Sequence, residues 1–432
     1  MAFPNPYRGL RGLPADVWII AVTTLVNRAG MMALPFLVLY LTRYLHISAS
    51  VAGLAISAYG VGGLITAPMA GRLADRFGSY VVIQASLALS GVLLLVFPLA
   101  RSVPLLFLLT FLWAIVADAA RPAVMSALTS NARPDQRKAA IALNRLAINL
   151  GMSIGPAVGG FLAQASFPLL FIVDGVTSLV AAGVLTALLR ARHRTRPASE
   201  RPVTGDAPAR FGAASVVWRD RAALALFATS LAMNIVFAQH QGAMPLYIVR
   251  DLHYRESFYG ALFVLNTLII VFTEVPLNVS MAHWPARPAL MLATALVAVG
   301  FGGLGVAHAP LPIAFTVVLW TIGEMIFFPT STAYVAQLAP AGRTGEYMGA
   351  FASTFSLALI VGPWIGTTLL DRVGPQSTWA VMLVLGLFAA ALPALAGAHG
   401  PRVVAAVPEP DESTTRSEAR PSGPLGSPAA PE

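Results

Sequence analysis

The sequence predicts an all-α polytopic membrane protein with twelve transmembrane helices arranged as two pseudo-symmetric six-helix bundles. Apolar runs of about 20 residues, the length that crosses a bilayer as a helix, can be read twelve times along the chain. The composition agrees, because 57% of the residues are hydrophobic and only 11% are charged. The chain also contains one segment twice, which divides the spans into two sets of six.

The internal repeat keeps one spacing over most of the chain. The segment from Tyr40 to Gly53 recurs from Tyr247 to Gly260, an offset of 207 residues (Tyr40 to Tyr247), and Trp113 falls on Trp320 at the same offset. Parallel repeats of membrane helices, related by an axis along the membrane normal, are an architecture of secondary transporters. We therefore expect two homologous halves that superpose about such an axis.

The spans and domains follow from hydropathy, because only helices satisfy the backbone over such lengths in lipid. The expected spans are 16–42, 49–71, 79–100, 103–128, 137–164, 168–190, 220–248, 256–280, 287–307, 310–338, 345–371 and 375–398. The expected domains are a cytoplasmic N-terminus (1–15), two six-helix bundles (16–190 and 220–398), a basic cytoplasmic linker (191–219) and a disordered tail rich in Pro and Ser (399–432).

Composition excludes several classes of site. The absence of cysteine excludes a disulfide framework and any thiolate metal site. Lys138 is the only lysine and Ala139 follows it, so the Lys-Ser/Thr ending of a phosphate-binding P-loop is missing. We expect no metal and no cofactor. Nucleic-acid binding is rejected despite the net charge of +9, because the arginines flank membrane spans instead of forming one patch.

The distribution of arginine predicts the orientation. With the N-terminus inside, most Lys and Arg residues lie in inside segments, as the positive-inside rule requires. The arginines expected outside are Arg43, Arg101, Arg250, Arg255 and Arg372. We therefore expect a multi-pass protein of the plasma membrane, with an even number of spans and both termini in the cytoplasm.

The loop after the second span carries the most specific motif. It reads Gly71-Arg-Leu-Ala-Asp75-Arg76-Phe-Gly78, which resembles the first cytoplasmic loop of the major facilitator superfamily, Gly-x-Leu-Ala-Asp-Arg-x-Gly. The resemblance extends over residues 16–398 and implies the major facilitator fold. It also implies that this loop holds the two halves together on the cytoplasmic side in the outward-open state. The alternative is that this segment is an ordinary cytoplasmic loop, whose basic residues follow only the positive-inside rule.

The fifth span carries a second motif, Gly151-Met-Ser-Ile-Gly155-Pro156-Ala-Val-Gly159-Gly160. It resembles the Gly-x3-Gly-Pro-x2-Gly-Gly signature that the superfamily associates with antiporters, chiefly drug:proton exporters. Small residues four apart let helices approach closely. The alternative is helix packing of a kind found in any transporter, because a similar patch occurs 207 residues later.

Ionisable and polar residues inside membrane spans are costly and mark functional sites by default. Those singled out for the cavity or for proton coupling are Arg28 in span 1, Asp118 and Arg121 in span 4, His240 and Gln241 in span 7, Glu274 in span 8 and Glu324 in span 10. The family resemblance places spans 1, 4, 7 and 10 around a central cavity. His240 is expected to donate or accept a hydrogen bond there rather than to carry a proton.

The proton carrier is predicted from the neighbours of each acid. Asp118 has Arg121 one turn away on the same face, so the pair suits a structural or substrate-anchoring role. Glu324 has no basic residue within a turn and is the better carrier, although Arg28 could reach either acid. For Glu274, a role in gating and a role in carrying the proton are equally expected. Arg145 is expected to stabilise the cytoplasmic gate.

The leading functional hypothesis is a monomeric secondary transporter for proton-coupled efflux of small amphiphilic organic compounds by alternating access, with protons and the lipid bilayer as its other partners. An uptake symporter for a sugar, a peptide or an organic anion remains the alternative. A polytopic membrane enzyme is remote, because six of the seven histidines lie in loops, at span ends or in the tail without metal-ligand spacing.

Overall fold

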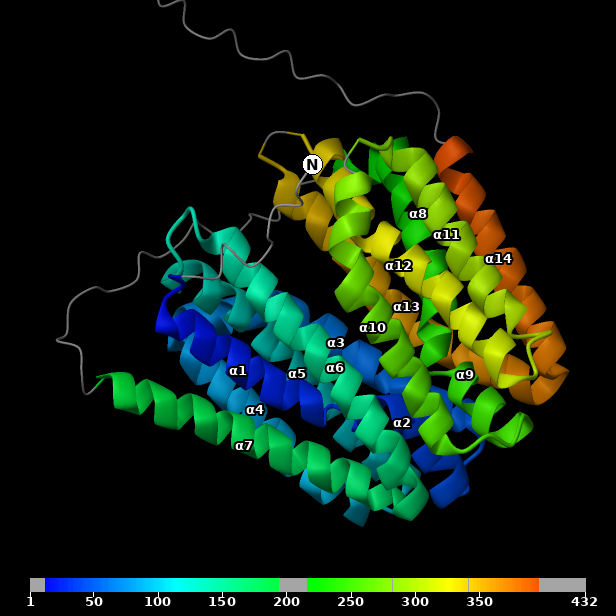
Figure 1. Ribbon diagram of the computed structural model, residues 1–432, viewed down its shortest axis with the longest axis horizontal. Helices are drawn as coiled ribbons and strands as arrows, with labels where there is room; N and C mark the ends of the chain where they lie inside the picture. Colours follow the sequence, from blue (N-terminus) through cyan, green and yellow to red (C-terminus); the bar gives the residue numbers. More distant parts are fainter. Residues whose placement is uncertain (1–11, 194–215, 282, 341, 396–432) are drawn as a thin grey trace, which may run out of the picture. The chain divides into compact units, whose positions relative to one another are not determined.

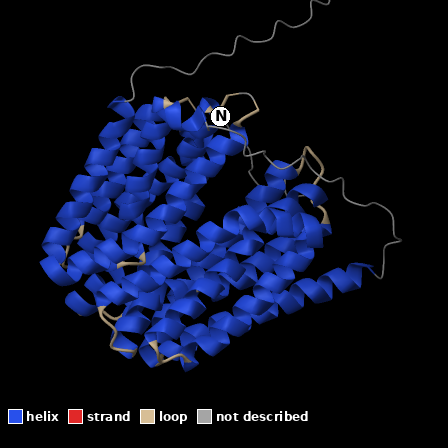
Figure 2. Cartoon of the chain, turned by 180° about the vertical axis from the view of Figure 1, so that it is seen from behind, coloured by secondary structure: helices blue, strands red, loops and turns tan. Residues whose placement is uncertain are grey.

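The computed structural model describes residues 12–193, 216–281, 283–340 and 342–395, and within these ranges it consists of helices without a strand (Figures 1 and 2). In this described part, 12 helical segments are long and apolar enough to cross a membrane, which confirms the predicted number of spans. The N-terminal segment up to residue 11, the tail predicted at 399–432 and most of the linker predicted at 191–219 lie outside the described residues.

The helices fall into an N-terminal half, α1 to α7, and a C-terminal half, η4 to α14. The N-terminal half comprises α1 (Ala15–Gly30), α2 (Ala33–Leu39), η2 (Tyr40–Tyr44), α3 (Ala49–Phe77), α4 (Ser79–Val96), η3 (Phe97–Leu99), α5 (Val103–Asn131), α6 (Arg137–Ala165) and α7 (Phe167–His193). The C-terminal half comprises η4 (Val216–Arg219), α8 (Arg221–Phe237), η5 (Ala238–His240), α9 (Ala243–Leu246), η6 (Tyr247–Asp251), α10 (Glu256–Ser280), α11 (Ala286–Gly303), α12 (Pro310–Leu338), α13 (Thr344–Val373) and α14 (Pro375–Leu395).

The offset of 207 residues seen in the sequence recurs in the helix bounds. The helix α11 begins and ends 207 residues after α4, and α12 does so after α5. The two short π-helices, η2 and η6, keep the same offset. His46 and His253, which follow them, have positive φ angles of 55° and 59°, a conformation that is uncommon for residues other than glycine. The repeat therefore includes backbone irregularities as well as helices.

Spans 1 and 7 are interrupted, whereas the sequence predicted continuous helices over 16–42 and 220–248. In span 1 the helix stops at Gly30 and restarts at Ala33. In span 7 it stops at Phe237 and restarts at Ala243, after a turn of 3₁₀-helix. The hydropathy of these segments carries no sign of a break. In a membrane protein such a break persists only where other protein groups bind the freed backbone groups.

Both interruptions have such partners. The carboxylate of Asp174 in α7 accepts hydrogen bonds from the backbone N–H groups of Met32 and Ala33, at 3.2 and 3.1 Å. In the other half the side-chain amide of Gln239 donates to the carbonyl oxygens of Ile235 and Gly362, at 2.9 and 2.8 Å. Asp174 is therefore a buried structural acid, since the residue is only 2% exposed.

The halves pack together mainly through two pairs of helices, α3 against α13 and α6 against α10. Glycine permits the close approach of α3 and α13. A Cβ atom at Gly60 would lie 2.9 Å from the backbone nitrogen of Ile360, closer than real Cβ atoms come. Since two of the three nearest atoms, Ile360 N and Leu359 C, belong to backbone, a side-chain rotation alone cannot relieve the contact.

We predict that Gly60→Ala lowers the stability of the folded protein by about 1–3 kcal/mol, because the added methyl group overpacks the junction of α3 and α13. Thermal unfolding in detergent measures the change. The control is Gly183→Ala in α7, where no atom lies within 4 Å of the added group and alanine favours the helix. Equal melting temperatures for the two variants would contradict the prediction.

Candidate functional site

The N-terminal half carries a charged cluster on α1 and α5. Arg121 and Asp118 lie one turn apart on α5, with Arg121 Nε 3.2 Å from Asp118 Oδ1, so the pair predicted from their spacing is formed. The side chain of Asp118 is 20% exposed and that of Arg121 is 58% exposed. Gly63 of α3 leaves room for the carboxylate, since a Cβ atom there would lie 2.5 Å from Asp118 Oδ2.

Arg28 lies in the last turn of α1, just before the interruption of span 1. Its Nη1 atom donates to the sulfur of Met31 at 2.9 Å, and it forms no ion pair with any acid of the described residues. Asp118, Asp174 and Arg121 lie close enough to interact with its charge. The side chain thus adds a positive charge beside the Asp118–Arg121 pair without joining it.

Glu324 occupies the corresponding part of the C-terminal half, on α12. It is 8% exposed, and its Oε1 atom accepts a hydrogen bond from the Asn266 amide of α10 at 3.0 Å. The same amide nitrogen lies 3.0 Å from the hydroxyl of Thr321. No basic residue in the described part of the chain forms an ion pair with Glu324, in keeping with the absence of basic residues in α12. Glu274 and Arg145 lie within electrostatic range.

Glu274 and Arg145 form an ion pair that crosses from α10 to α6 and so joins the two halves. The glutamate side chain is 11% exposed and the arginine side chain is 54% exposed. The sequence singled out both residues but could not pair them, because they are 129 positions apart. This geometry suits a contact between the halves, and it places a cation beside Glu274 that Glu324 lacks.

An aromatic cluster surrounds the interruption of span 7, and the sequence analysis did not identify it. The indole ring of Trp320 stacks against Phe301 on one side and His240 on the other, with centroid distances of 5.6 and 6.4 Å. A small cavity in this cluster is lined by His240, Met244, Leu262, Phe263 and Trp320. The predicted residue Gln241 follows His240 in the interruption and is half-buried.

The tautomer of His240 follows from its hydrogen bond. Its Nδ1 atom lies 2.6 Å from the carbonyl oxygen of Phe237. A carbonyl oxygen only accepts, so Nδ1 carries the hydrogen and Nε2 of the neutral ring is left as an acceptor. In this conformation His240 therefore bonds to its own helix end, and its Nε2 atom is left beside the aromatic cluster.

The first-loop motif lies at the end of the bundle where α3 meets α4, which we call the first-loop end. Asp75 and Arg76 are exposed there, Arg76 packs over the ring of Phe77, and Gly78 makes the turn with a φ of 86°. Asp75 forms no ion pair or hydrogen bond within the described residues, and a Cβ atom at Gly71 or Gly78 would meet nothing within 4 Å. In this conformation the motif does not join the halves.

The span-5 motif lies between the interruption of span 1 and the opposite half. Gly151 and Gly155 pack against the last turn of α1, and Gly159 packs against Met32 and α2. Gly160 and the carbonyl oxygen of Pro156 face α10 of the C-terminal half. The small residues of α6 therefore serve two contacts, one within the half and one between the halves.

The far end of the bundle, where η2 meets α3 and η6 meets α10, is closed by contacts between the halves. Arg43 of η2 and Glu256 at the start of α10 form an ion pair of 2.8 Å. The hydroxyl of Tyr259, which is fully buried, lies 3.2 Å from the carbonyl oxygen of Pro35 and 2.7 Å from that of His240. With Asp75 free at the first-loop end, the chain is held together at the far end.

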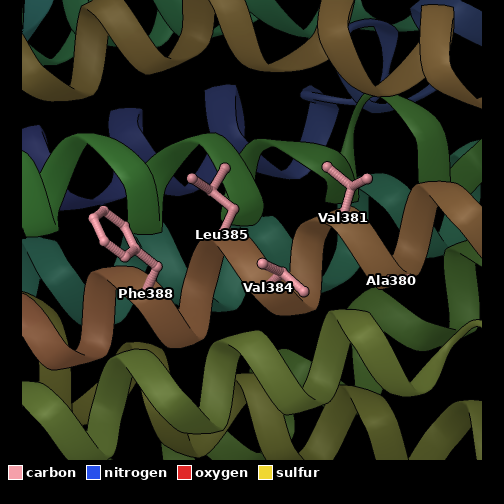
Figure 3. Close-up of a pocket in the computed structure, with 5 residues that line it drawn as sticks. All are labelled: Ala380, Val381, Val384, Leu385 and Phe388. Carbon is pink, nitrogen blue, oxygen red and sulfur yellow. The ribbon is translucent and has the colours of Figure 1, made fainter.

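An open groove on α14 is a different kind of surface. Figure 3 shows its lining, Ala380, Val381, Val384, Leu385 and Phe388. All five residues are apolar and come from one helix, and Val384 and Phe388 are 67% and 62% exposed. None of the ionisable residues described above lines it, so we interpret it as surface in contact with lipid.

Comparison with known families agrees with this architecture. Residues 20–247 and 240–429 match the Major Facilitator Superfamily. The chain belongs to this superfamily. The family predicted from the first-loop motif is therefore confirmed, and the match spans both halves.

Relatives with known names include transporters of the same class. The MFS-type transporter YqjV of Bacillus subtilis (strain 168) is 26% identical over 387 residues, which cover 88% of this chain and 93% of that protein. Multidrug resistance protein 1 of the same organism is 26% identical over 341 residues, 76% of this chain and 82% of that protein. Among solved structures, the peptide transporter POT in complex with sulfate has a TM-score of 0.71 at 18% identity, covering 91% of this chain and 97% of that one.

We predict that reversing either charge of the Arg43–Glu256 pair, as Arg43→Glu or Glu256→Arg, opens the far end and that the double reversal restores closure. The measurement is the labelling of Ser257→Cys, which lies between α10 and α6, with a membrane-impermeant maleimide; the natural chain has no cysteine to react. We expect a few-fold faster labelling in each single reversal, since a partly exposed ion pair contributes about 1 kcal/mol or less.

The control for this prediction is Arg250→Glu. Arg250 stands 207 residues after Arg43 but pairs within its own half, with Asp251 and Asp371. Its reversal should leave the labelling rate of Ser257→Cys unchanged. The interpretation of the Arg43–Glu256 pair as a gate fails if the Arg250 and Arg43 reversals change the labelling rate of Ser257→Cys equally. It also fails if the double reversal is labelled as fast as the single ones.

Proposed function

We propose that this chain is a proton-coupled efflux transporter of the plasma membrane, with both termini in the cytoplasm, that exports small amphiphilic organic compounds by alternating access. The observation that carries the proposal is the environment of Glu324. It is a buried acid in a membrane span that is bound by an amide and has no ion-pair partner among the described residues.

A carboxyl group in this setting suits proton carriage. An ionised carboxylate is costly to bury without a cation, whereas a protonated carboxyl group can remain and can share a hydrogen bond with Asn266. A side chain that is ionised when open to water and protonated when enclosed changes charge during the cycle. Asp118 and Glu274 are less suited, because each already has an arginine partner.

The remaining groups of the site suit an amphiphilic substrate. Arg28, Asp118 and Arg121 offer charges of both signs on the N-terminal half. The small cavity lined by His240, Met244, Leu262, Phe263 and Trp320 offers an apolar and aromatic lining on the C-terminal half. A compound with a polar group and a hydrophobic body could contact both halves at once.

Two sequence similarities support export. The span-5 motif resembles the signature of drug:proton exporters, and multidrug resistance protein 1 of B. subtilis aligns with most of the chain. The alternative is proton-coupled uptake of a small nutrient such as a sugar, a peptide or an organic anion. Arg28 and Arg121 favour it, because two arginines near one acid would bind an anion.

The contacts at the two ends of the bundle are consistent with alternating access, in which one end is closed while the other is open. At the first-loop end Asp75 has no partner in the described conformation, while the far end is closed by Arg43, Glu256 and Tyr259. In the opposite conformation Asp75 would contact the other half. Its role would then be to shift a conformational equilibrium rather than to stabilise the fold.

We predict that the purified chain in proteoliposomes moves protons in the direction opposite to an amphiphilic dye such as ethidium, and that Glu324→Gln abolishes dye transport driven by a proton gradient while dye counterflow is retained. Counterflow is the exchange of dye across the membrane, and it requires only that the dye-loaded protein change its conformation. A variant that has lost proton coupling therefore still performs it. A pH-sensitive dye inside the vesicles reports direction, and co-directional movement would support the uptake alternative.

The matched control is Glu346→Gln in α13, whose carboxylate pairs with Arg343 near the helix end. It should keep gradient-driven transport. Full proton-driven activity in Glu324→Gln would exclude Glu324 as the carrier and transfer the role to Glu274 or Asp118.

We predict that Asp75→Asn lowers the turnover rate by on the order of tenfold, since a loss of about 1.4 kcal/mol from one state shifts the equilibrium by that factor. The amount of protein in the membrane should not change, because Asp75 is exposed and unpaired in the described conformation. Initial transport rates at saturating dye measure the effect. Asp135→Asn, an exposed acid at the same end, is the control. Normal turnover in Asp75→Asn would refute the role.

A further inference from the structure

We propose that Asp174 of α7 is a positioning residue, whose carboxylate holds the interruption of span 1 and thereby fixes Arg28 beside the Asp118–Arg121 pair. Where Arg28 is taken to contact substrate, this inference rests on the proposed function. The Asp174 carboxylate forms no hydrogen bond with Arg28, Asp118 or Arg121; both of its bonds come from backbone N–H groups where the helix restarts, those of Met32 and Ala33.

The carboxylate is placed to hold the chain where its helix is broken. Asp174 is 2% exposed, and a single oxygen, Oδ2, accepts from Met32 and Ala33 at 3.2 and 3.1 Å. Without it, two N–H groups in the middle of a membrane span would have no acceptor, at a cost of about 1–3 kcal/mol each. The interruption of span 1 therefore depends on this side chain.

The same face of α7 also fixes the residues before the interruption. Ser178, one turn after Asp174, accepts a hydrogen bond from the Asn27 amide at 3.2 Å. Thr177 lies against Gly30 so closely that no larger residue would fit at position 30. Three side chains of one helix thus hold both sides of the break, with Arg28 between the residues they contact.

The other side of Arg28 is closed by α6. A Cβ atom at Gly151 would collide with the Arg28 side chain, and one at Gly155 would lie 3.1 Å from the Arg28 carbonyl oxygen. The backbone at Arg28 is therefore enclosed between α6 and α7. Its guanidinium group turns toward Met31 Sδ, where Asp118, Arg121 and Tyr59 are close enough to interact with its charge.

The other half shows that a charged group is not required to build such an interruption. The position 207 residues after Asp174 is Val381, and the position 207 residues after Arg28 is Ile235. There the neutral amide of Gln239 holds the break by donating to two carbonyl oxygens. The carboxylate occurs in the half that also carries the arginine, which links Asp174 to the placement of Arg28.

The first test uses thiol labelling and does not depend on transport. In the full chain, which has no natural cysteine, Arg28→Cys is labelled with an uncharged methanethiosulfonate, so that the charge of Asp174 does not itself attract the reagent. We expect Asp174→Asn to lower the labelling rate at position 28 by threefold or more. The rate at Arg121→Cys on α5 should not change. Equal rates at position 28 with and without Asp174→Asn would overturn the proposal.

The second test separates positioning from folding. We expect Asp174→Asn and Arg28→Gln each to shift the KM for ethidium efflux in the same direction, with kcat unchanged, and the double variant to add nothing to the larger single effect. Thr186→Ala on the same helix, which removes the exposed bond from Gln84 and keeps the carboxylate, should have the KM of the natural chain. Additive effects of Asp174→Asn and Arg28→Gln would overturn the proposal.

Two further outcomes are decisive. If the natural chain moves no dye but the labelling rate at position 28 still falls in Asp174→Asn, the proposed function fails and the positioning role stands. If Asp174→Asn does not fold, Asp174→Thr, which keeps an acceptor oxygen without charge, is labelled in its place. If neither variant folds, Asp174 is required for folding alone and the positioning role is overturned.

Discussion

Satisfying the backbone inside the bilayer is the constraint on which the rest of this structure depends. A continuous helix meets it without help, but spans 1 and 7 are broken, and each break frees N–H or carbonyl groups where no water can bind them. The chain supplies Asp174 at one break and Gln239 at the other. Arg28, His240 and the aromatic cluster all lie within a few residues of these breaks or pack against them.

The two halves share a backbone plan but differ in their chemistry. Tyr59 of the N-terminal half stands where Asn266 stands in the C-terminal half, and their partners differ accordingly. Tyr59 packs edge-on against Trp113, whereas Asn266 binds Glu324. Under the function proposed above, this divergence lets one half bind the charge of the substrate while the other carries the proton.

Local patterns allowed much of the fold and part of the site to be predicted from the sequence. The spans follow from hydropathy, and the Asp118–Arg121 pair follows from a spacing of three on one helix. The ion pair of Arg145 and Glu274 and the bond between Asn266 and Glu324 join residues far apart in the chain, which no local rule can pair. The breaks were missed because hydropathy does not report them. Asp174, which binds the first break, lies on α7, and Gln239, inside the second, bonds to Gly362 of α13.

The buried hydroxyl of Tyr259 has a consequence for how the far end opens. A phenol has one hydrogen to donate, yet two carbonyl oxygens compete for it, Pro35 in the N-terminal half at 3.2 Å and His240 in the C-terminal half at 2.7 Å. The shorter bond lies within the half that carries Tyr259 itself. When the halves separate, the hydrogen can stay with His240, and only an acceptor is released. In the alternating-access cycle proposed above, opening therefore leaves no unpaired donor at this position in the membrane.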